Sequence, residues 1–356
     1  MMGQEHIRNI NLLPDAHVAA IVEPDPGMMA AALALAPQAR PATSIAELLS
    51  GADIDCILVA SPNFRHVEQL EEIAATRPLP VLVEKPLFTD PADEARIAAL
   101  RQRLPLIWVA MEYRYMPPVA KFIADAADAT GGIRMLTIRE HRYPFLSKVG
   151  DWNRFDRHTG GTFVEKCCHF FDLMRLILRA DPVRVMASGG QAVNHRDERP
   201  GGETPDIWDH GYVLVEFAGG ARAMLELCMF AEGSRYQEEI SAVGEAGKIE
   251  CLVPGPGRFW PAHLGPPPVP QVIVSPRQPA GARTVHIPVD PVLLSAGDHN
   301  GSTFFEHRKF IDAVRGRGEI EVSLDDGWWA VVIGLAAHRS AREGRAVELV
   351  REFALP

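Results

Sequence analysis

The sequence Val81-Leu82-Val83-Glu84-Lys85-Pro86 is the strongest indication of how this chain folds. Its first three residues form a β-branched, apolar run that is typical of a parallel strand covered on both faces. An acid, a base and a proline end the run, at the position where open parallel sheets bind their ligands. An unpaired ammonium group is costly to bury, and only six of the 36 basic residues are lysines. Lys85 is therefore either a solvated strand-end residue or a functional group, and the tripeptide alone leaves both interpretations open.

Helix-like and strand-like segments alternate on both sides of this run. Such alternation implies βαβ crossovers and therefore an α/β fold with a doubly wound parallel sheet. Pro117-Pro118 breaks the alternation, so we predict a Rossmann-like dinucleotide-binding domain over residues 1–116. The expected strands are 17–22, 55–60, 79–83 and 106–110, and the expected helices are 4–12, 27–37, 45–49, 66–76 and 92–103.

The second half of the chain, residues 117–356, has a different pattern. Pairs of apolar segments flank short glycine-containing turns, which is typical of antiparallel hairpins. We predict an α+β domain with a large, mostly antiparallel sheet, which binds substrate and forms oligomers. Eleven of the 29 prolines lie in residues 254–291, which predicts a long loop. The expected strands are 133–140, 183–187, 211–217, 221–229, 238–243 and 248–252, and the expected helices are 163–178, 303–314 and 325–343.

The start of the sequence fits only part of a dinucleotide-binding unit. Gly3 can be the third glycine of a GxGxxG turn, and Glu23 follows about 20 residues later at a strand end, where a ribose-binding carboxylate is expected. The first strand and the first two glycines of such a unit are missing from the sequence. Because that strand is central in a doubly wound sheet, we expect its two neighbours to lack a partner. We also expect that the printed sequence begins inside a longer reading frame or was shortened; alternatively, Gly3 is only a loop glycine.

Composition limits the classes of partner. The 356-residue chain is 47% hydrophobic and 23% charged, as in ordinary globular proteins, and it is long enough for two domains. A net charge of −10 argues against nucleic acid and anionic membranes as partners. No membrane-spanning run or secretory signal is visible, and the five scattered cysteines favour a reducing cytoplasm over a disulfide framework.

The motifs together resemble those of the glucose–fructose oxidoreductase/inositol dehydrogenase/MocA family over nearly the whole chain. Asn63 and Lys85 lie 22 residues apart, each at a strand end, and their two motifs together are the most specific signal. The resemblance implies an NAD(P)-dependent dehydrogenase that transfers hydride between nicotinamide and a carbinol of a sugar, cyclitol or sugar acid. The motifs that carry it are Met2-Gly3-Gln4-Glu5-His6, Glu23-Pro24-Asp25, Ser61-Pro62-Asn63 with His66, Glu84-Lys85-Pro86, Gly160-Gly161, His169 and Asp172.

The same resemblance implies three catalytic residues. Lys85 would reach the substrate beside the nicotinamide, His169 would act as the acid/base, and Glu165 occupies the position of an assisting aspartate in relatives. Imidazole titrates near working pH, and a nearby ammonium group stabilises a developing alkoxide. Because one helical turn separates Glu165 from His169, we expect the carboxylate to orient the ring. The alternative for His169 is a satisfied core histidine next to Phe170 and Phe171.

The predicted cofactor is NAD. A carboxylate at Glu23 accepts ribose hydroxyls and repels a 2′-phosphate, although an arginine from elsewhere could still allow NADP. Arg114 and Asp172 have substrate-binding and structural interpretations that we weigh equally. No metal is predicted, because the adjacent Cys167 and Cys168 cannot easily face one ion from a helix. The predicted cofactor-binding residues are Gly3, Glu23, Ser61, Pro62, Asn63, His66 and Glu84.

Two other functions remain open at this point. One is a non-catalytic regulator on the same fold that senses sugars or nucleotides, although such a sensor has no need of a proton acceptor beside nicotinamide. The other is a keto-reductase or an NAD-assisted glycoside-cleaving enzyme. For the dehydrogenase, the expected partners are a small polyol or sugar substrate and further copies of the chain, as a homodimer or homotetramer.

Overall fold

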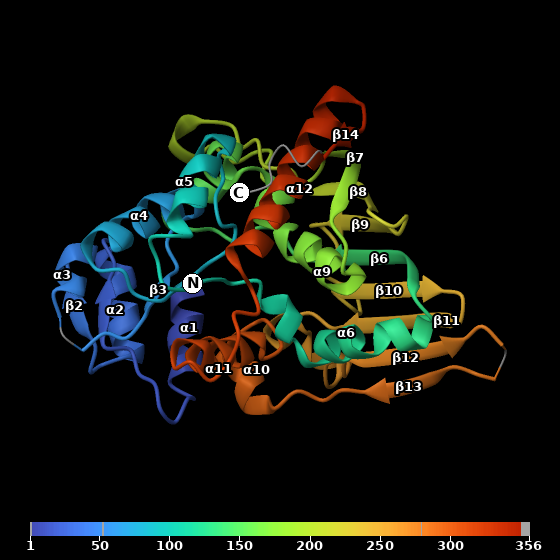
Figure 1. The fold of residues 1–356 in the computed structure, drawn as a ribbon, viewed down its shortest axis with the longest axis horizontal. Coiled ribbons are helices and arrows are strands. Elements are labelled where there is room, and N and C mark those ends of the chain that lie inside the picture. Colours follow the sequence, from blue (N-terminus) through green and yellow to red (C-terminus); the bar gives the residue numbers. More distant parts are fainter. Residues whose placement is uncertain (1, 52, 279, 350–356) are drawn as a thin grey trace.

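A computed structural model describes residues 2–51, 53–278 and 280–349 (Figure 1). Its amino-terminal part carries short parallel strands between helices, and its carboxyl-terminal part is built on one large sheet. The amino-terminal elements are α1 (Met2–Ile10), β1 (Ala20–Val22), α2 (Pro26–Leu35), β2 (Arg40–Ala42), α3 (Ile45–Leu49), β3 (Ile57–Val59), α4 (His66–Thr76), β4 (Val81–Val83), α5 (Glu94–Leu100) and β5 (Ile107–Val109).

The parallel strands form two separate sheets. β1 pairs with β2, and β3, β4 and β5 pair in that order. Among the described residues no strand joins β1 to β3, which confirms the expectation that two strands would each lack a neighbour. Burial follows the same division, because β4 is fully buried whereas every residue of β1 is only half-buried. β2 was not predicted from the sequence, since a proline stands at the centre of its three residues.

The carboxyl-terminal sheet has nine strands in the order β13-β12-β11-β10-β6-β9-β8-β7-β14. All neighbouring strands are antiparallel except β6 and β9, so the prediction of a large, mostly antiparallel sheet is confirmed. The strands are β6 (Ile133–His141), β7 (Pro182–Gly190), β8 (His210–Phe217), β9 (Arg222–Cys228), β10 (Glu238–Gly244), β11 (Gly247–Val253), β12 (Gln271–Pro276), β13 (Arg283–His286) and β14 (Val347–Glu348).

Helices cover one face of this sheet (Figure 1). They are α6 (Pro117–Thr130), α9 (Cys168–Leu178) and α12 (Leu324–Glu343). Leu136 and Ile138 of β6 are buried, whereas Met135 on the same strand is 60% exposed. Met186 of β7 and Tyr212 of β8 are also exposed. The second face of the sheet is therefore exposed at these positions of the described chain. Pro117 begins α6, and the predicted domain boundary at that residue stays a prediction.

Two predicted segments differ from the structure. The helix expected over 163–178 is interrupted, because α8 (Thr162–Glu165) ends and α9 begins only at Cys168. The proline-rich segment 254–291 is not one long loop, since β12 and β13 extend the sheet within it. Proline is tolerated there because Pro276 is the last residue of β12, and the edge strand β13 contains no proline.

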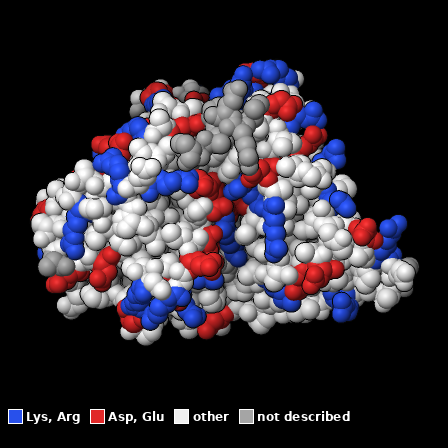
Figure 2. All heavy atoms as spheres, in the orientation of Figure 1, with Lys and Arg blue, Asp and Glu red and all other residues white. Residues whose placement is uncertain are grey.

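The end of the chain returns to the amino-terminal part. Helices α10 (Pro291–Ala296) and α11 (Ser302–Val314) lie beside α1 (Figure 1). Gly327 of α12 packs so closely on Val109 that an added Cβ would come within 2.7 Å of that side chain. The two parts thus share a packed interface, where acidic and basic side chains lie together on the surface (Figure 2), and residues of both parts line the pocket described below. No helix in the described parts of the chain has the length and apolarity needed to cross a membrane.

Candidate active site

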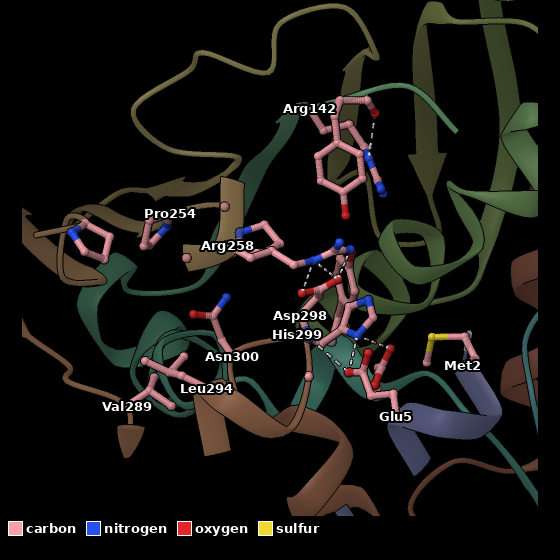
Figure 3. Close-up of a pocket in the computed structure, with 18 of the residues that line it drawn as sticks. Met2, Glu5, Arg142, Pro254, Arg258, Val289, Leu294, Asp298, His299 and Asn300 are labelled. Carbon is pink, nitrogen blue, oxygen red and sulfur yellow. Dashed lines mark hydrogen bonds and ion pairs between the residues drawn. The ribbon is translucent and has the colours of Figure 1, made fainter. Parts of the chain in front are cut away.

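A pocket with a volume of about 940 Å³ is lined by residues from both parts of the chain (Figure 3). The amino-terminal part contributes the start of α1 and Lys85, which lies two residues after β4. The carboxyl-terminal part contributes α8, α9, the segment after β6 and the proline-rich segment. Pockets that bind small molecules are commonly of this size and lie between domains. The lining residues used below are Met2, Gln4, Glu5, Lys85, Glu112, Tyr113, Arg142, Lys148, Glu165, Lys166, His169, Arg258, Asp298 and His299.

Lys85 lies where the sequence predicts, directly after β4 and at the pocket wall. Its ammonium group donates a hydrogen bond to the backbone carbonyl of Glu165, with an Nζ–O distance of 3.0 Å. Burial opposes its charged form, but nearby negative groups, Glu165 first, outweigh burial and raise the pKa of Lys85. Lys85 therefore keeps its proton and can donate a hydrogen bond to a ligand oxygen.

His169 also lines the pocket, from the first turn of α9. Its ring stacks on Tyr113 with centroids 4.1 Å apart and an angle of 8° between the planes. Burial lowers the pKa of His169 well below its ordinary value, and the charges of Lys85 and Lys166 lower it further. Its buried Nδ1 has no hydrogen-bond partner within the described chain. His169 is thus a neutral imidazole with free hydrogen-bonding capacity at neutral pH.

The expected pairing of Glu165 with His169 is wrong. The Glu165 carboxylate accepts a hydrogen bond from the Asn63 amide instead, and no hydrogen bond joins it to the His169 ring. The reason is the break between α8 and α9, which removes the continuous helical turn on which the expectation rested. Tyr113, rather than a carboxylate, fixes the plane of the imidazole. Glu165 still lines the pocket and still contacts Lys85 through its carbonyl.

A buried network of charged side chains contacts the Tyr113 side of this stack. Lys166 donates to the Tyr113 hydroxyl at 2.6 Å and pairs with Glu140 at 2.9 Å. Burial lowers the pKa of Lys166, Arg142 lowers it further, and Glu140 partly opposes both. Burial and the charge of Glu140 raise the pKa of Glu238 to about 7. Sequence reasoning missed this network, although the scarcity of lysine was a usable signal, because three of the six lysines line the pocket.

The predicted cofactor residues form a connected framework beside the pocket rather than its lining. Glu84 pairs with His6 of α1 at 2.7 Å, and His6 contacts His307 at 2.9 Å. His66 is fully buried, with Nδ1 2.8 Å from the Pro86 carbonyl and Nε2 3.1 Å from the Ser61 carbonyl. These contacts hold the ends of β3 and β4 in place, so their cofactor roles stay predictions.

Three further predicted cofactor residues lie at strand or helix ends. Glu23 follows β1, is half-buried and accepts a hydrogen bond from the Asp25 amide at 2.9 Å. Gly3 lies in the first turn of α1, where an added Cβ would meet only Ala60, at 3.9 Å. Pro62 precedes the short 3₁₀ turn Asn63–Arg65. None of the three lines the pocket.

Arg114 and Asp172 form a buried ion pair outside the pocket lining, and their substrate-binding interpretation stays a prediction. The Arg114 Nε donates to Asp172 at 2.6 Å, both side chains are buried, and neither lines the pocket. Burial raises the pKa of Asp172, and the Arg114 charge opposes that shift. Arg114 also donates to the Glu321 backbone carbonyl at 2.5 Å, so it joins the start of α6 to the segment before α12.

A second histidine, His299, lines the pocket, whereas His307 does not. His299 donates to Glu5 at 2.8 Å and lies 3.4 Å from Glu112, so three possible metal ligands cluster here (Figure 3). Burial lowers the pKa of His299, but Glu112 and Glu5 outweigh it and raise the pKa to about 9. The same pairing lowers the pKa of Glu5 to about 2 against the effect of burial. Glu5 and His299 are thus an ion pair, and Glu112, whose pKa is raised chiefly by burial, lies beside it.

A split Rossmann-like sheet, a second part with an open antiparallel sheet, and a lysine and a histidine that line one pocket between them are typical of a two-domain oxidoreductase. The chain belongs to the GFO/IDH/MocA oxidoreductase family. Its NAD-binding Rossmann-fold model matches residues 1–112, and its carboxyl-terminal α/β domain model matches residues 128–349.

Similar proteins include inositol 2-dehydrogenases. That of Corynebacterium glutamicum strain R is 39% identical over 150 residues, which are 41% of this chain and 44% of the relative. The matched region is therefore less than half of that relative's length. The inositol 2-dehydrogenase of Streptomyces avermitilis is 28% identical over 351 residues, covering 96% and 90% of the two chains. A levoglucosan dehydrogenase solved with NADH and levoglucosan shares the fold, with a TM-score of 0.77, 20% identity and coverage of 98% and 96%.

Proposed function

We propose that this protein is an NAD-dependent dehydrogenase that oxidises a carbinol of a sugar, cyclitol or sugar acid. The observation that carries the proposal is that Lys85 and His169 both line one pocket between the two parts of the chain. A charged ammonium and a neutral imidazole are the two groups that removal of a hydroxyl proton and stabilisation of an alkoxide require. The inositol 2-dehydrogenases among the relatives and the NADH complex of a structural neighbour support the same chemistry.

The residues that are present fit a nicotinamide cofactor. Met2 and Gln4 bring the start of α1 to the pocket, where free backbone N–H groups favour a pyrophosphate. Glu23 at the end of β1 is available for ribose hydroxyls. The unpartnered Nδ1 of His169 shows hydrogen-bonding capacity that the described chain does not use. When bound, NAD would supply the hydride acceptor.

The chain's own residues handle the proton. His169 accepts the hydroxyl proton of the substrate on its neutral ring, and Tyr113 holds the ring plane during that transfer. Lys85 keeps its proton and donates a hydrogen bond to the substrate oxygen, which favours the developing alkoxide. The carbon–hydrogen electron pair leaves as hydride, so the carbinol becomes a carbonyl and the enzyme retains one proton.

Turnover of a polyol and sugar panel with NAD, followed by NADH absorbance, tests this function. His169→Ala and Lys85→Ala are each expected to lower kcat by about 10²–10⁴-fold. Lys121→Ala is the matched control, because Lys121 lies in an exposed ion pair with Asp125 on α6. Unchanged turnover in both site variants would contradict the assignment. Cofactor binding without turnover on any substrate would instead favour a sensing regulator.

Two further properties belong to this proposal. We propose a homodimer or homotetramer formed through the open face of the nine-stranded sheet, since Met135, Met186 and Tyr212 are exposed there. We also propose a cytoplasmic location, because all five cysteines are free thiols. Light scattering of the purified protein and of a Met135→Lys variant tests the first property.

A further inference from the structure

The pocket holds more positive charge than its own carboxylates neutralise. Arg258 is paired with Asp298, with Nε 2.8 and 2.9 Å from the two carboxylate oxygens (Figure 3). His299 is paired with Glu5, as described above. Lys166 is paired with Glu140. Arg8 donates to the Ala296 carbonyl at 2.8 Å, and three other cations of the lining remain without a dedicated carboxylate: Lys85, Arg142 and Lys148.

Lys85 already has a role in proton handling, so the excess charge is that of Lys148 and Arg142. Arg142 lies 3.5 Å from Glu140, whose carboxylate is closer to Lys166. Its guanidinium group packs on the Tyr143 ring at 4.3 Å, which fixes it beside the pocket. Figure 3 shows Arg142 on the wall above Arg258 and His299.

Lys148 is the less satisfied of the two. It follows β6 and precedes the turn Val149–Arg154, and its ammonium group lies 5.6 Å from the centroid of the Trp152 ring. Within the described chain no carboxylate lies at ion-pair distance from Lys148. Burial lowers its pKa, and Lys85 and Arg142 lower it further against a partial effect of Glu165. A partly buried ammonium without an anion is unfavourable, and a ligand anion would relieve that cost.

We propose that the substrate carries a carboxylate, and that Lys148 binds it together with Arg142 while Lys85 and His169 act on a hydroxyl. The inference rests on the proposed dehydrogenase function and narrows its substrate to a sugar acid or a cyclitol acid. The available charge favours a carboxylate over a phosphate, because of the two cations only Lys148 has no ion pair within the described chain, whereas Arg142 is shared with Glu140. A dianionic phosphate is usually held by more than one free cation or by a bidentate arginine.

The bound anion would also act on the base. The neighbouring cations are part of what depresses the basicity of His169. A carboxylate between Lys148 and Arg142 offsets that positive field, so the pKa of His169 rises toward the working pH when the acid substrate binds. A neutral polyol lacks this effect. The site would therefore favour acids both in binding and in proton transfer.

Binding is measured first, because it does not depend on turnover. Trp152 fluorescence of the NAD-saturated protein is titrated with D-gluconate, D-glucitol and D-glucose 6-phosphate, since Lys148 lies over that indole. We expect gluconate to bind about 10–100-fold more tightly than glucitol, from the usual strength of charged hydrogen bonds. Lys148→Met should abolish this preference, Lys148→Arg should restore part of it, and the exposed Lys121→Met should leave it intact.

The outcomes separate this inference from the proposed function. Equal affinity for gluconate and glucitol, or an undiminished preference in Lys148→Met, would overturn the carboxylate site. A stronger response to the phosphate would replace carboxylate by phosphate and overturn it as well. An equal loss of NAD affinity in Lys148→Met would assign the lysine to the cofactor. Selective gluconate binding without NADH formation would support the anion site while contradicting the dehydrogenase.

Discussion

His169 and Tyr113 lie ring on ring, with centroids 4.1 Å apart and nearly parallel planes. Tyr113 comes from the short turn that follows β5, and His169 is the second residue of α9, so the stack joins the two parts of the chain at the pocket. Since no carboxylate bonds to the imidazole among the described contacts, this stack and the helix position are what orient the base.

The stack predicts a graded response at Tyr113. Tyr113→Phe keeps the stacked ring and loses only the hydrogen bond from Lys166, so kcat should fall by less than about 10-fold. Tyr113→Ala removes the ring and should lower kcat by a further factor of about 10 or more, because a misplaced base loses most of its advantage. Steady-state kinetics at fixed pH measure both. Equal effects of the two variants would show that the hydroxyl, not the stack, matters.

Lys166 should tune the base. Its charge helps to lower the pKa of His169, after burial and Lys85. Removing that charge in Lys166→Met should therefore raise the pKa of His169. The neutral form is the active base, so the acid limb of the kcat/KM profile should move to higher pH. A pH profile of wild type and variant measures the shift, with Lys309→Met, an exposed lysine paired with Glu321, as control. An acid limb that moves to lower pH would contradict the arrangement.

Buried neutral histidines should make the fold sensitive to acid. Burial lowers the pKa of His338 to about 3, and its Nε2 accepts a hydrogen bond from the Phe163 amide. The unfolded chain takes up this proton near pH 6.5 and the folded chain only near pH 3. The contribution of His338 to the free energy of unfolding is therefore fully present above about pH 6.5. It is lost by about 1.4 kcal/mol per pH unit as the pH falls from there toward about pH 3.

Urea unfolding at several pH values checks this dependence. His338→Gln should reduce the pH dependence of the free energy of unfolding below about pH 6.5 by the contribution of one histidine. The exposed His286→Gln is the matched control and should leave the slope unchanged. A variant slope equal to that of wild type would show that His338 does not contribute.

The buried Arg114–Asp172 pair should matter for stability and not for substrate affinity. Asp172→Asn removes the nearer of the two carboxylates beside the buried Arg114 guanidinium and leaves only Asp326 at 3.4 Å, so we expect a loss of up to about 3–5 kcal/mol in the free energy of unfolding. The double variant Arg114→Met/Asp172→Leu should recover much of that loss, because both charges are then absent. Chemical denaturation measures it. A large rise in KM with unchanged stability would restore the substrate-binding interpretation.

The open edges of β1 and β3 should accept a strand. A designed amino-terminal extension of five β-branched residues ending in Gly-Ala-Gly is expected to pair with both edges, raise the Tm and tighten NAD binding. Hydrogen exchange at Ala20–Val22 and Ile57–Val59 measures the pairing directly. The same extension with alternate prolines is the control, because proline cannot donate to the ladder. Equal exchange with both extensions would contradict the predicted pairing.

Much of the architecture follows from local sequence. The buried run Val81–Val83 and the helix at His66–Thr76 lie where their residues predict them. Gly344 ends α12 in a left-handed conformation, as a glycine after a long apolar helix suggests. These features depend on apolar periodicity and on backbone preferences of single residues, which act over a few positions. The same local logic brought Lys85 and His169 forward as candidates, because each stands in a short motif.

The pairing of side chains was decided by the tertiary structure. Helix periodicity linked Glu165 to His169, but the chain breaks between α8 and α9 and Asn63, 102 residues away, takes the carboxylate. Likewise Glu5 and His299 meet across a separation of 294 residues. Such contacts depend on how far-separated elements pack, and a buried charge selects whichever partner that packing brings within reach. The sequence by itself therefore determined which residues are candidates for the chemistry, while only the folded interface decided which of them touch.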